Sequence, residues 1–461
     1  MSNRLDLSPD ALEAHWHRAT RRGRNLAKEF GVNPGQYSKR VKRIRKLTER
    51  TASARKDRNA AGRLGDMARV GSLSDDIAAL SQERERQIRK LARNVSENLS
   101  RGGFRASISV GQVIAGATTY QLEGAKPESF FVSQAVLSAL RSTFRVQSLS
   151  RDAAVRLVHL ALSERLPKTV IRADISKCFE SISHDRLLRL LRSGPSVPAL
   201  VITYVVDLLR NYAILTGQAP ESAVGLPRGI PVSSYLAEIY LYRVEADIAD
   251  SFQHSLVVRY VDDFFVVVPE ANRTKGLVLE RFEKVQSIVR SHDLELSPDL
   301  KKNFASLLEK QPAKAARFNF LGYEFVYKVN CVEVRISRSR AARLWERLGA
   351  ALDAYARSDP MNGRAQKLLY RRIRFLTSNI RLANSKRGAY VGVYYSSKHA
   401  TSVDRFLAID RMLRYRVATS AAPVALRDRL LSLSLHDGFH HKRFATFDLS
   451  QMKELKSVWS S

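Results

Sequence analysis

The sequence predicts an α+β fold in which a centre of mixed strands and helices lies between two helical ends. Of the 461 residues, 44% are hydrophobic and 26% are charged, which are the proportions of a folded globular protein. Short β-branched and aromatic runs occur in the centre, whereas apolar residues recur at helical spacing toward both ends. At about 150 residues per domain, the length corresponds to roughly two to four domains or to one large fold with appendages.

Residues 1–100 are predicted to form a basic α-helical N-terminal extension. Val41, Ile44 and Leu47 lie three residues apart, which places an apolar stripe on one side of a helix. The cationic side chains around this stripe are Lys39, Arg40, Lys42, Arg43, Arg45 and Lys46. The pattern favours an RNA-facing helix, and a solvated helix face is the alternative.

The chain carries a large positive charge. Its 77 Lys and Arg residues outnumber its 45 Asp and Glu residues, for a formal net charge of +32. Such a surface attracts polyanions, and nucleic acid is the commonest partner because it gains from counterion release; an anionic membrane surface is the alternative. The sequence has no run of about 18 uncharged apolar residues and no apolar signal core, so we expect a cytoplasmic chain without a membrane partner.

Cysteine is rare, since only Cys178 and Cys331 occur. Two cysteines cannot build a disulfide framework or the cysteine-based half of a zinc finger. We expect both to be small buried residues.

Residues 256–268 are predicted to form a β-hairpin with two acids at its turn. Strongly β-prone apolar runs flank the pair Asp262 and Asp263. Carboxylates between buried strands are unfavourable unless a cation neutralises them, and a divalent ion would do so. The alternative is an ordinary hairpin with an acidic turn, because Asp is a favoured turn residue.

A third acid, Asp174, ends another predicted strand in residues 168–175, and a helix is predicted to begin within residues 183–188. An acid at the end of one strand can project beside the turn of another strand. Three carboxylates placed in this way can hold two Mg²⁺ ions, the arrangement that supports phosphoryl transfer. Taken alone, Asp174 is more typical of a helix cap or a surface acid.

Between these acids, residues 224–241 form a loop rich in Gly and Pro that runs into a predicted helix with Ser at its start. Gly lets the backbone approach a ligand closely, and helix N-termini favour anions. The loop is therefore predicted to contact a base-paired nucleotide or a template, and simple helix capping is the alternative.

Four segments together resemble motifs of the reverse transcriptases in the order A, B, C and E. They are Arg-Ala-Asp-Ile-Ser-Lys-Cys-Phe at 172–179, Leu-Pro-Arg-Gly-Ile-Pro-Val-Ser at 226–233, Tyr-Val-Asp-Asp at 260–263 and Phe-Leu-Gly-Tyr at 320–323. One such tetrapeptide means little, but four in this order and spacing are specific. The resemblance covers residues of about 105 to 335.

The resemblance implies a right-hand polymerase fold with fingers, a palm bearing an antiparallel sheet, and a helical thumb. Residues 101–335 would form the fingers and palm, and residues 336–461 a helical thumb with a basic C-terminal region. Both helical ends are extensions of this fold. The basic ends predict RNA contacts, at the N-terminal cations named above and at Arg371 and Arg372.

The resemblance also assigns roles to single residues. Asp174, Asp262 and Asp263 would be catalytic and would ligate two Mg²⁺ ions, for which Mn²⁺ can substitute. Phe179 matches the gate beneath the incoming sugar, and a core aromatic is the alternative; Arg228 stands where related enzymes usually have Gln. The residues implied in nucleotide binding are Phe179, Arg228, Gly229, Ser233 and Lys301, and those implied in the primer grip are Leu321, Gly322 and Tyr323.

The loop Pro-Arg-Gly, followed by Ser-Ser-Tyr-Leu-Ala-Glu-Ile-Tyr-Leu at 233–241, resembles the abortive-infection and defence-associated (unknown-group) class of bacterial reverse transcriptases, which is related to retron and group II intron enzymes. This resemblance implies an RNA-directed DNA polymerase that uses dNTPs and a dedicated non-coding RNA in bacterial antiphage defence. It also implies a DNA product, and a companion defence protein or self-assembly as a further association.

Two other functions fit the same residues. The first is a template-independent or protein-primed nucleotidyl transferase, or an RNA polymerase; Phe179 argues against ribonucleotides. The second is a non-catalytic, maturase-like RNA-binding scaffold, against which stands the presence of all three acids.

Overall fold

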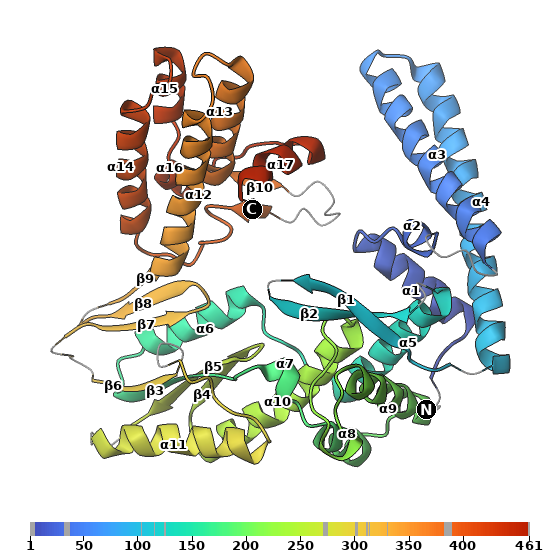
Figure 1. Ribbon diagram of the computed structural model, residues 1–461, viewed down its shortest axis with the longest axis horizontal. Helices are drawn as coiled ribbons and strands as arrows, with labels where there is room; N and C mark the ends of the chain where they lie inside the picture. Colours follow the sequence, from blue (N-terminus) through green and yellow to red (C-terminus); the bar gives the residue numbers. More distant parts are fainter. Residues whose placement is uncertain are drawn as a thin grey trace. The chain divides into compact units, whose positions relative to one another are not determined.

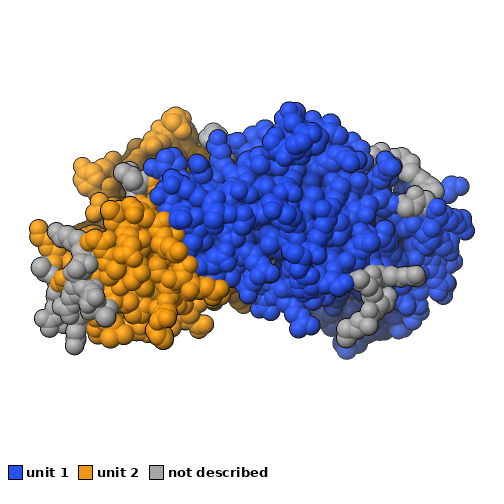
Figure 2. Space-filling model, turned by 90° about the horizontal axis from the view of Figure 1, so that it is seen from below, with its two compact units in different colours: residues 1–148, 175–248, 286–298 blue, residues 149–174, 249–285, 299–461 orange. Residues whose placement is uncertain are grey.

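A computed structural model describes residues 5–31, 37–102, 104–114, 116–123, 126–270, 275–299, 303–309, 312, 314–329, 331–381 and 390–459. The chain divides into two compact units that interleave along the sequence (Figure 2). Unit 1 comprises Met1–Ser148, Ile175–Ile248 and Gln286–Pro298. Unit 2 comprises Leu149–Asp174, Ala249–Val285 and Asp299–Ser461. The functional division expected at residues 100 and 335 stays a prediction.

Unit 1 begins with four helices, as expected for the N-terminal extension (Figure 1). They are α1 (Pro9–Arg21), α2 (Leu26–Phe30), α3 (Ser38–Arg63) and α4 (Met67–Gly102). The long helices α3 and α4 pack against each other. Val41, Ile44 and Leu47 are buried on α3, so the predicted apolar stripe is confirmed. Its cationic residues Lys39 and Lys42 are exposed.

The rest of unit 1 is a small hairpin with helices. Its elements are β1 (Ile108–Ile114), β2 (Ala117–Leu122), α5 (Pro127–Phe144), α7 (Cys178–Ser181), α8 (His184–Ser193), α9 (Ala199–Leu215) and most of α10 (Pro231–Ser251). The strands β1 and β2 pair in antiparallel fashion. The hydroxyl of Ser183 caps α8 by accepting from the backbone N–H of Arg186, which confirms the predicted helix start.

Unit 2 contains an antiparallel sheet with the strand order β4-β5-β3-β6. Its strands are β3 (Lys168–Asp174), β4 (Leu256–Tyr260), β5 (Asp263–Pro269) and β6 (Phe304–Leu308). The central strands β3 and β5 are almost wholly buried. Helix α6 (Arg151–Ser163) packs Val155 and Val158 into one core with Val170 and Phe265 of the sheet.

A second sheet in unit 2 adds β7 (Ala316–Phe320), β8 (Tyr323–Tyr327) and β9 (Val332–Ile336) in that order. Its inward side chains join the same core, because Phe320 lies 5.2 Å from Phe265 between ring centroids. Beyond the second sheet the chain is mainly helical, as expected. The helices are α12 (Arg338–Ala356), α13 (Gly363–Thr377), α14 (Asp404–Ala418), α15 (Val424–Leu431), α16 (Leu435–His440) and α17 (Leu449–Lys456).

These helices enclose a core of their own (Figure 1). Its members include Leu352 of α12, Ile373 of α13 and Leu413 of α14. Two short paired strands, β10 (Asn379–Arg381) and β11 (Tyr390–Gly392), interrupt the helical region. The sequence pattern did not predict them, because three-residue strands are too short to show a periodicity. Helix α11 (Lys275–Ser291) follows β5.

The expectation for the cysteines is half wrong. Cys178 is buried, but Cys331 is exposed, because it lies in the connection between β8 and β9 rather than inside a strand. Among the helices that the structure describes, none combines the length and apolar character needed to cross a membrane.

Candidate active site

Strand pairing brings the three predicted acids to one end of the sheet in unit 2. Asp174, the last residue of β3, lies directly opposite Asp263, the first residue of β5. Asp262 precedes Asp263 in the two-residue loop between β4 and β5. Directly opposite residues in an antiparallel pair carry their side chains on the same face, with Cβ atoms about 4.5–5.5 Å apart. The predicted hairpin and the expected meeting of Asp174 with its turn are therefore confirmed.

The hairpin turn holds a strained residue. Val261, the first of the two loop residues, has a φ of 59° and is 39% exposed. The first loop residue of a type II′ turn needs a positive φ, which is why Gly is usual there. A β-branched residue in this region costs about 1–3 kcal/mol, so surrounding contacts must hold it. One such contact comes from buried Arg259, whose Nη1 donates to the carbonyl of Val261 at 3.2 Å.

A buried ion pair ties Asp263 to the neighbouring strand. Arg172 of β3 donates from Nε to Oδ1 of Asp263 at 2.9 Å and from Nη2 to Oδ2 at 2.7 Å. Both side chains are nearly buried, at 12% and 11% exposure. Burial raises the pKa of Asp263, the Arg172 guanidinium lowers it, and the carboxylates of Asp174 and Asp262 raise it again, so that the net shift is upward.

The end of β3 is fixed by the side chain of Asn303, the residue that precedes β6. The pairing of β3 with β6 stops at Arg172 and Phe304, two residues before Asp174. The backbone N–H of Asp174 instead donates to Oδ1 of Asn303 at 2.7 Å. Asn303 and Asp174 are both buried, so this bond satisfies a group that would otherwise be unpaired.

The donor set suits a hard divalent cation, because carboxylate oxygens are the ligands that Mg²⁺ prefers. Asp263 already shares its two oxygens with Arg172, and each oxygen keeps a second acceptor position. Among the described residues, only Glu13, His17 and Glu85 bring three potential ligand atoms within 4.8 Å of one another, so the ligand oxygens of the three aspartates are spaced more widely than that in this structure. Those acids are paired with Arg89 and Arg84, and they lie in unit 1.

Unit 1 carries the predicted nucleotide residues around Phe179. Phe179 is half-buried, and the guanidinium of Arg228 lies 5.1 Å above its ring. Arg228 also forms a bidentate ion pair with Glu180, with distances of 2.6 and 2.8 Å. The loop is anchored to α7, because the N–H of Leu226 donates to the carbonyl of Phe179 at 2.7 Å.

Gly229 of the loop and Ser233 at the start of α10, both predicted to bind the nucleotide, differ in their exposure to solvent. Gly229 is exposed with a φ of 96°, and an added Cβ would lie 2.8 Å from the carbonyl oxygen of Tyr120. Only Gly fits this close approach. Ser233, in contrast, is fully buried, and its hydroxyl has no hydrogen-bond partner among the described residues. A ligand therefore does not reach Ser233 in this structure.

The predicted primer-grip residues form the tight turn between β7 and β8 in unit 2. Leu321 and Gly322 have φ values of 47° and 76°, the two positive values of a type I′ hairpin turn. Gly322 supplies the positive φ that the second position of this turn requires. Tyr323 is fully buried, with its hydroxyl donating to the carbonyl of Ser396 at 3.2 Å.

The remaining predicted cations differ in exposure. Lys301 lies outside the described residues. Arg40 and Arg43 of α3 contact α4, through Gln87 at 3.2 Å and Glu83 at 2.8 Å. Arg371 is half-buried, but Arg372 is only 7% exposed, so solvent reaches the first of this pair and not the second.

Three residues at these sites escaped the sequence analysis. Arg172 carried a signal, because it lies two residues before Asp174 and so shares its face of the strand. Glu180 and Asn303 carried none, since their partners are distant in the sequence and are set by the packing of the fold.

Comparisons with known proteins concern the same part of the chain. The family model described as reverse transcriptase (RNA-dependent DNA polymerase) matches residues 100–325. No curated protein matches the sequence. The chain is also similar to solved structures of telomerase, described next.

Telomerase from Candida albicans, in complex with a TWJ fragment of telomeric RNA, is 12% identical, with a TM-score of 0.32, over 72% of this chain and 56% of that chain. Telomerase from Candida tropicalis, in complex with the same kind of fragment, is 10% identical, with a TM-score of 0.34, over 82% of this chain and 68% of that chain. The chain thus spans little more than half of the Candida albicans telomerase chain.

Proposed function

The chain contains a reverse transcriptase domain at residues 100–325, with the right-hand polymerase fold of that family, and from this premise we propose that it copies an RNA template into DNA with Asp174, Asp262 and Asp263 as its catalytic carboxylates. The domain is that of RNA-directed DNA polymerases, which are nucleotidyltransferases. The observation that carries the proposal is the pairing of β3 with β5, which sets Asp174 opposite Asp263 beside the turn that holds Asp262.

The three carboxylates would hold two Mg²⁺ ions, or Mn²⁺ in their place. When bound, such a pair of ions lowers the pKa of an attacking hydroxyl and stabilises the leaving oxygen of a phosphate. Strand pairing supports this assignment, because it sets Asp174 opposite Asp263 beside the loop that holds Asp262, and Arg172 binds the Asp263 carboxylate. The reaction joins a primer or protein hydroxyl to the α-phosphate of a dNTP and releases pyrophosphate.

Phe179 would exclude ribonucleotides. Its ring is only half-buried, and it is held against the Arg228 guanidinium, which Glu180 fixes in turn. A rigid ring beside the sugar would meet a 2′-hydroxyl, whereas a deoxyribose leaves that space free. Arg228 itself is a donor that could meet the nucleotide or the template.

The nucleic-acid partner is proposed to be a dedicated non-coding RNA, with a DNA copy as product, in bacterial antiphage defence. The net charge of +32 and the exposed cations Lys39 and Lys42 support an RNA partner. The resemblance of residues 226–241 to the defence-associated class supports the biological setting.

Primer extension on an RNA template tests this proposal. We expect Asp262→Asn to lower dNTP incorporation by about 10²- to 10³-fold or more, because it removes charge where the reaction develops it. Asp185→Asn is the matched control, since that side chain is 71% exposed on α8 and its one ion pair within the described ranges is with Arg189 of the same helix. Equal incorporation by the Asp262 variant would contradict the assignment.

A further inference from the structure

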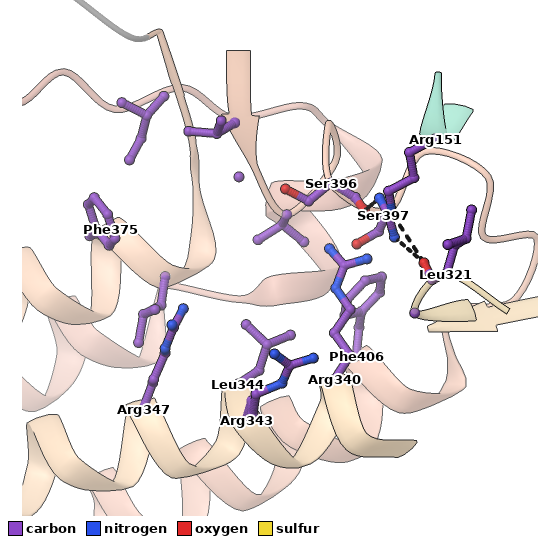
Figure 3. A pocket seen from close by; sticks show the side chains of 16 residues that line it. Arg151, Leu321, Arg340, Arg343, Leu344, Arg347, Phe375, Ser396, Ser397 and Phe406 are labelled. Atoms are coloured by element: carbon purple, nitrogen blue, oxygen red, sulfur yellow. Dashed lines mark hydrogen bonds between the residues drawn. The ribbon is translucent and has the colours of Figure 1, made fainter. Parts of the chain in front are cut away.

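A cavity of about 510 Å³ in unit 2 is lined by four arginines (Figure 3). Arg340, Arg343 and Arg347 extend from α12, and Arg151 comes from the start of α6. The three residues of α12 are three and four positions apart, so they share one face of the helix. The residues that line the cavity include no Asp or Glu.

The positive charges of this cavity have no counter-charge. Within the part of the chain that the structure describes, no carboxylate forms an ion pair with any of the four arginines. Arg151 donates to the backbone carbonyl of Leu321 at 3.1 and 2.5 Å, and to that of Ser396 at 3.4 Å. Carbonyl groups satisfy these N–H groups but do not cancel the charge.

The lack of a partner for these positive groups is clearest at Arg340. Its Nη1 is buried and has no hydrogen-bond partner in the described structure. Burial lowers the pKa of Arg340, the charges of Arg151 and Arg343 lower it further, and Tyr323 raises it in part. An unsatisfied buried donor costs about 1–3 kcal/mol, and an anion in the cavity would balance the positive charge around it.

The shape and chemistry of the cavity narrow the class of anion. Guanidinium groups match phosphate oxygens, to which they donate two parallel hydrogen bonds. Other walls are apolar and include the side chains of Leu344 and Phe375, on which a flat base could lie. The volume falls in the usual range of small-molecule sites, roughly 300–1,000 Å³.

We propose that this cavity binds a nucleoside di- or triphosphate, with Arg340, Arg343 and Arg347 holding its phosphates. The site is distinct from the three aspartates, none of which lines the cavity, and its wall includes Leu321 and Gly322 of the predicted primer grip. A phosphate at the end of a nucleic-acid strand shares the same chemistry. The apolar wall, beside which a base fits, favours the free nucleotide. The inference goes beyond the proposed polymerase activity and does not depend on it.

Binding of a fluorescent ATP analogue tests the proposal. The full chain, freed of nucleic acid, is titrated in EDTA, so that metal-dependent binding at the aspartates does not contribute. We expect the double variant Arg343→Ala/Arg347→Ala to bind the analogue at least tenfold more weakly, which corresponds to about 1.4 kcal/mol. Both residues are exposed, so the variant should fold.

Arg338→Ala is the matched control, because Arg338 lies on the same helix, is 79% exposed and does not line the cavity. We expect its affinity to change less than about twofold. Unlabelled ATP, inorganic triphosphate and a 5′-phosphorylated single-stranded oligonucleotide are added as competitors. Displacement by ATP with a tenfold loss in the double variant supports the proposal.

Two results would overturn it. The first is equal affinity of the wild type and the double variant for the analogue. The second is no saturable binding of the analogue while the double variant loses affinity for the oligonucleotide, which would assign the cavity to a strand end. The variant Asp262→Asn should bind the analogue normally in EDTA, so a failed polymerase assay leaves this result unaffected.

Discussion

Two arginines of unit 2, Arg172 and Arg340, differ in whether a carboxylate of the described chain pairs with them. At the end of the sheet, Arg172 is nearly buried and donates two hydrogen bonds to Asp263, so the charge of this one carboxylate is paired inside the protein. In the cavity beside α12, Arg340 buries a nitrogen that has no partner in the described structure. Arg172 pairs with the neighbouring Asp263 carboxylate. Arg340 lies at the cavity for which we propose a bound phosphate as the source of negative charge. The comparison separates a structural charge from one that awaits a ligand.

The largest expected effect on stability is at the balanced pair. Arg172→Met leaves the Asp263 carboxylate buried without a cation, and breaking such a pair lowers the free energy of unfolding by about 3–5 kcal/mol. Urea unfolding at pH 7 measures this change. The double variant Arg172→Met/Asp263→Asn should recover part of the loss, because it removes the unpaired charge. No recovery would show that Arg172 acts through packing alone.

The next effect concerns the cavity with its ligand. A nucleotide that binds only the folded chain stabilises it by about 2.7 kcal/mol at a concentration one hundred times its Kd. We expect ATP in EDTA to raise the free energy of unfolding of the wild type by this amount. At the same ATP concentration, Arg343→Ala/Arg347→Ala should be stabilised clearly less. Equal stabilisation of the wild type and the double variant would contradict ATP binding by Arg343 and Arg347.

A smaller effect is expected when the unbalanced arginine is removed without ligand. Arg340→Met keeps an apolar stem and removes the unpaired donor, which offsets the lost contact of Arg340 with the Tyr323 ring at 5.9 Å. We expect the free energy of unfolding in phosphate-free buffer to change by less than about 1 kcal/mol. A loss as large as that of Arg172→Met would mean that both arginines are structural.

The smallest effect is expected at Glu333 of β9, whose cation Lys328 is 44% exposed. Burial raises the pKa of Glu333, but the contacts with Lys328 and Arg335 outweigh it and hold the pKa at about 2, below its ordinary value of 4.5. The lowered pKa stabilises the fold above pH 4.5, and this contribution is lost as the pH falls toward 2. Water screens the pair, so Glu333→Gln should cost less than about 1 kcal/mol at pH 7. Urea unfolding at several pH values should show that difference disappear in acid.

The sequence allowed prediction of the elements that depend on local patterns. The hairpin around Asp262 and the strand that ends at Asp174 both follow from residue types over a few positions. The apolar stripe of α3 follows from helical periodicity in the same way.

The partners of these residues could not be predicted, because they come from distant parts of the chain. Asn303 reaches Asp174 across 129 residues, and Arg151 reaches Leu321 across 170. Such pairs are chosen by packing of whole elements, which no local pattern reports. The same reason explains the cavity, whose arginines come from two helices far apart in the sequence.

Metal binding tests the central claim most directly, since the claim is that Asp174, Asp262 and Asp263 jointly hold two divalent ions. Electron paramagnetic resonance can count bound Mn²⁺ on the chain with an RNA template, a primer and a non-reactive dNTP analogue. The account predicts about two tightly bound ions per wild-type chain, and fewer in Asp174→Asn and Asp262→Asn. Two ions in every variant, or none in the wild type, would contradict it.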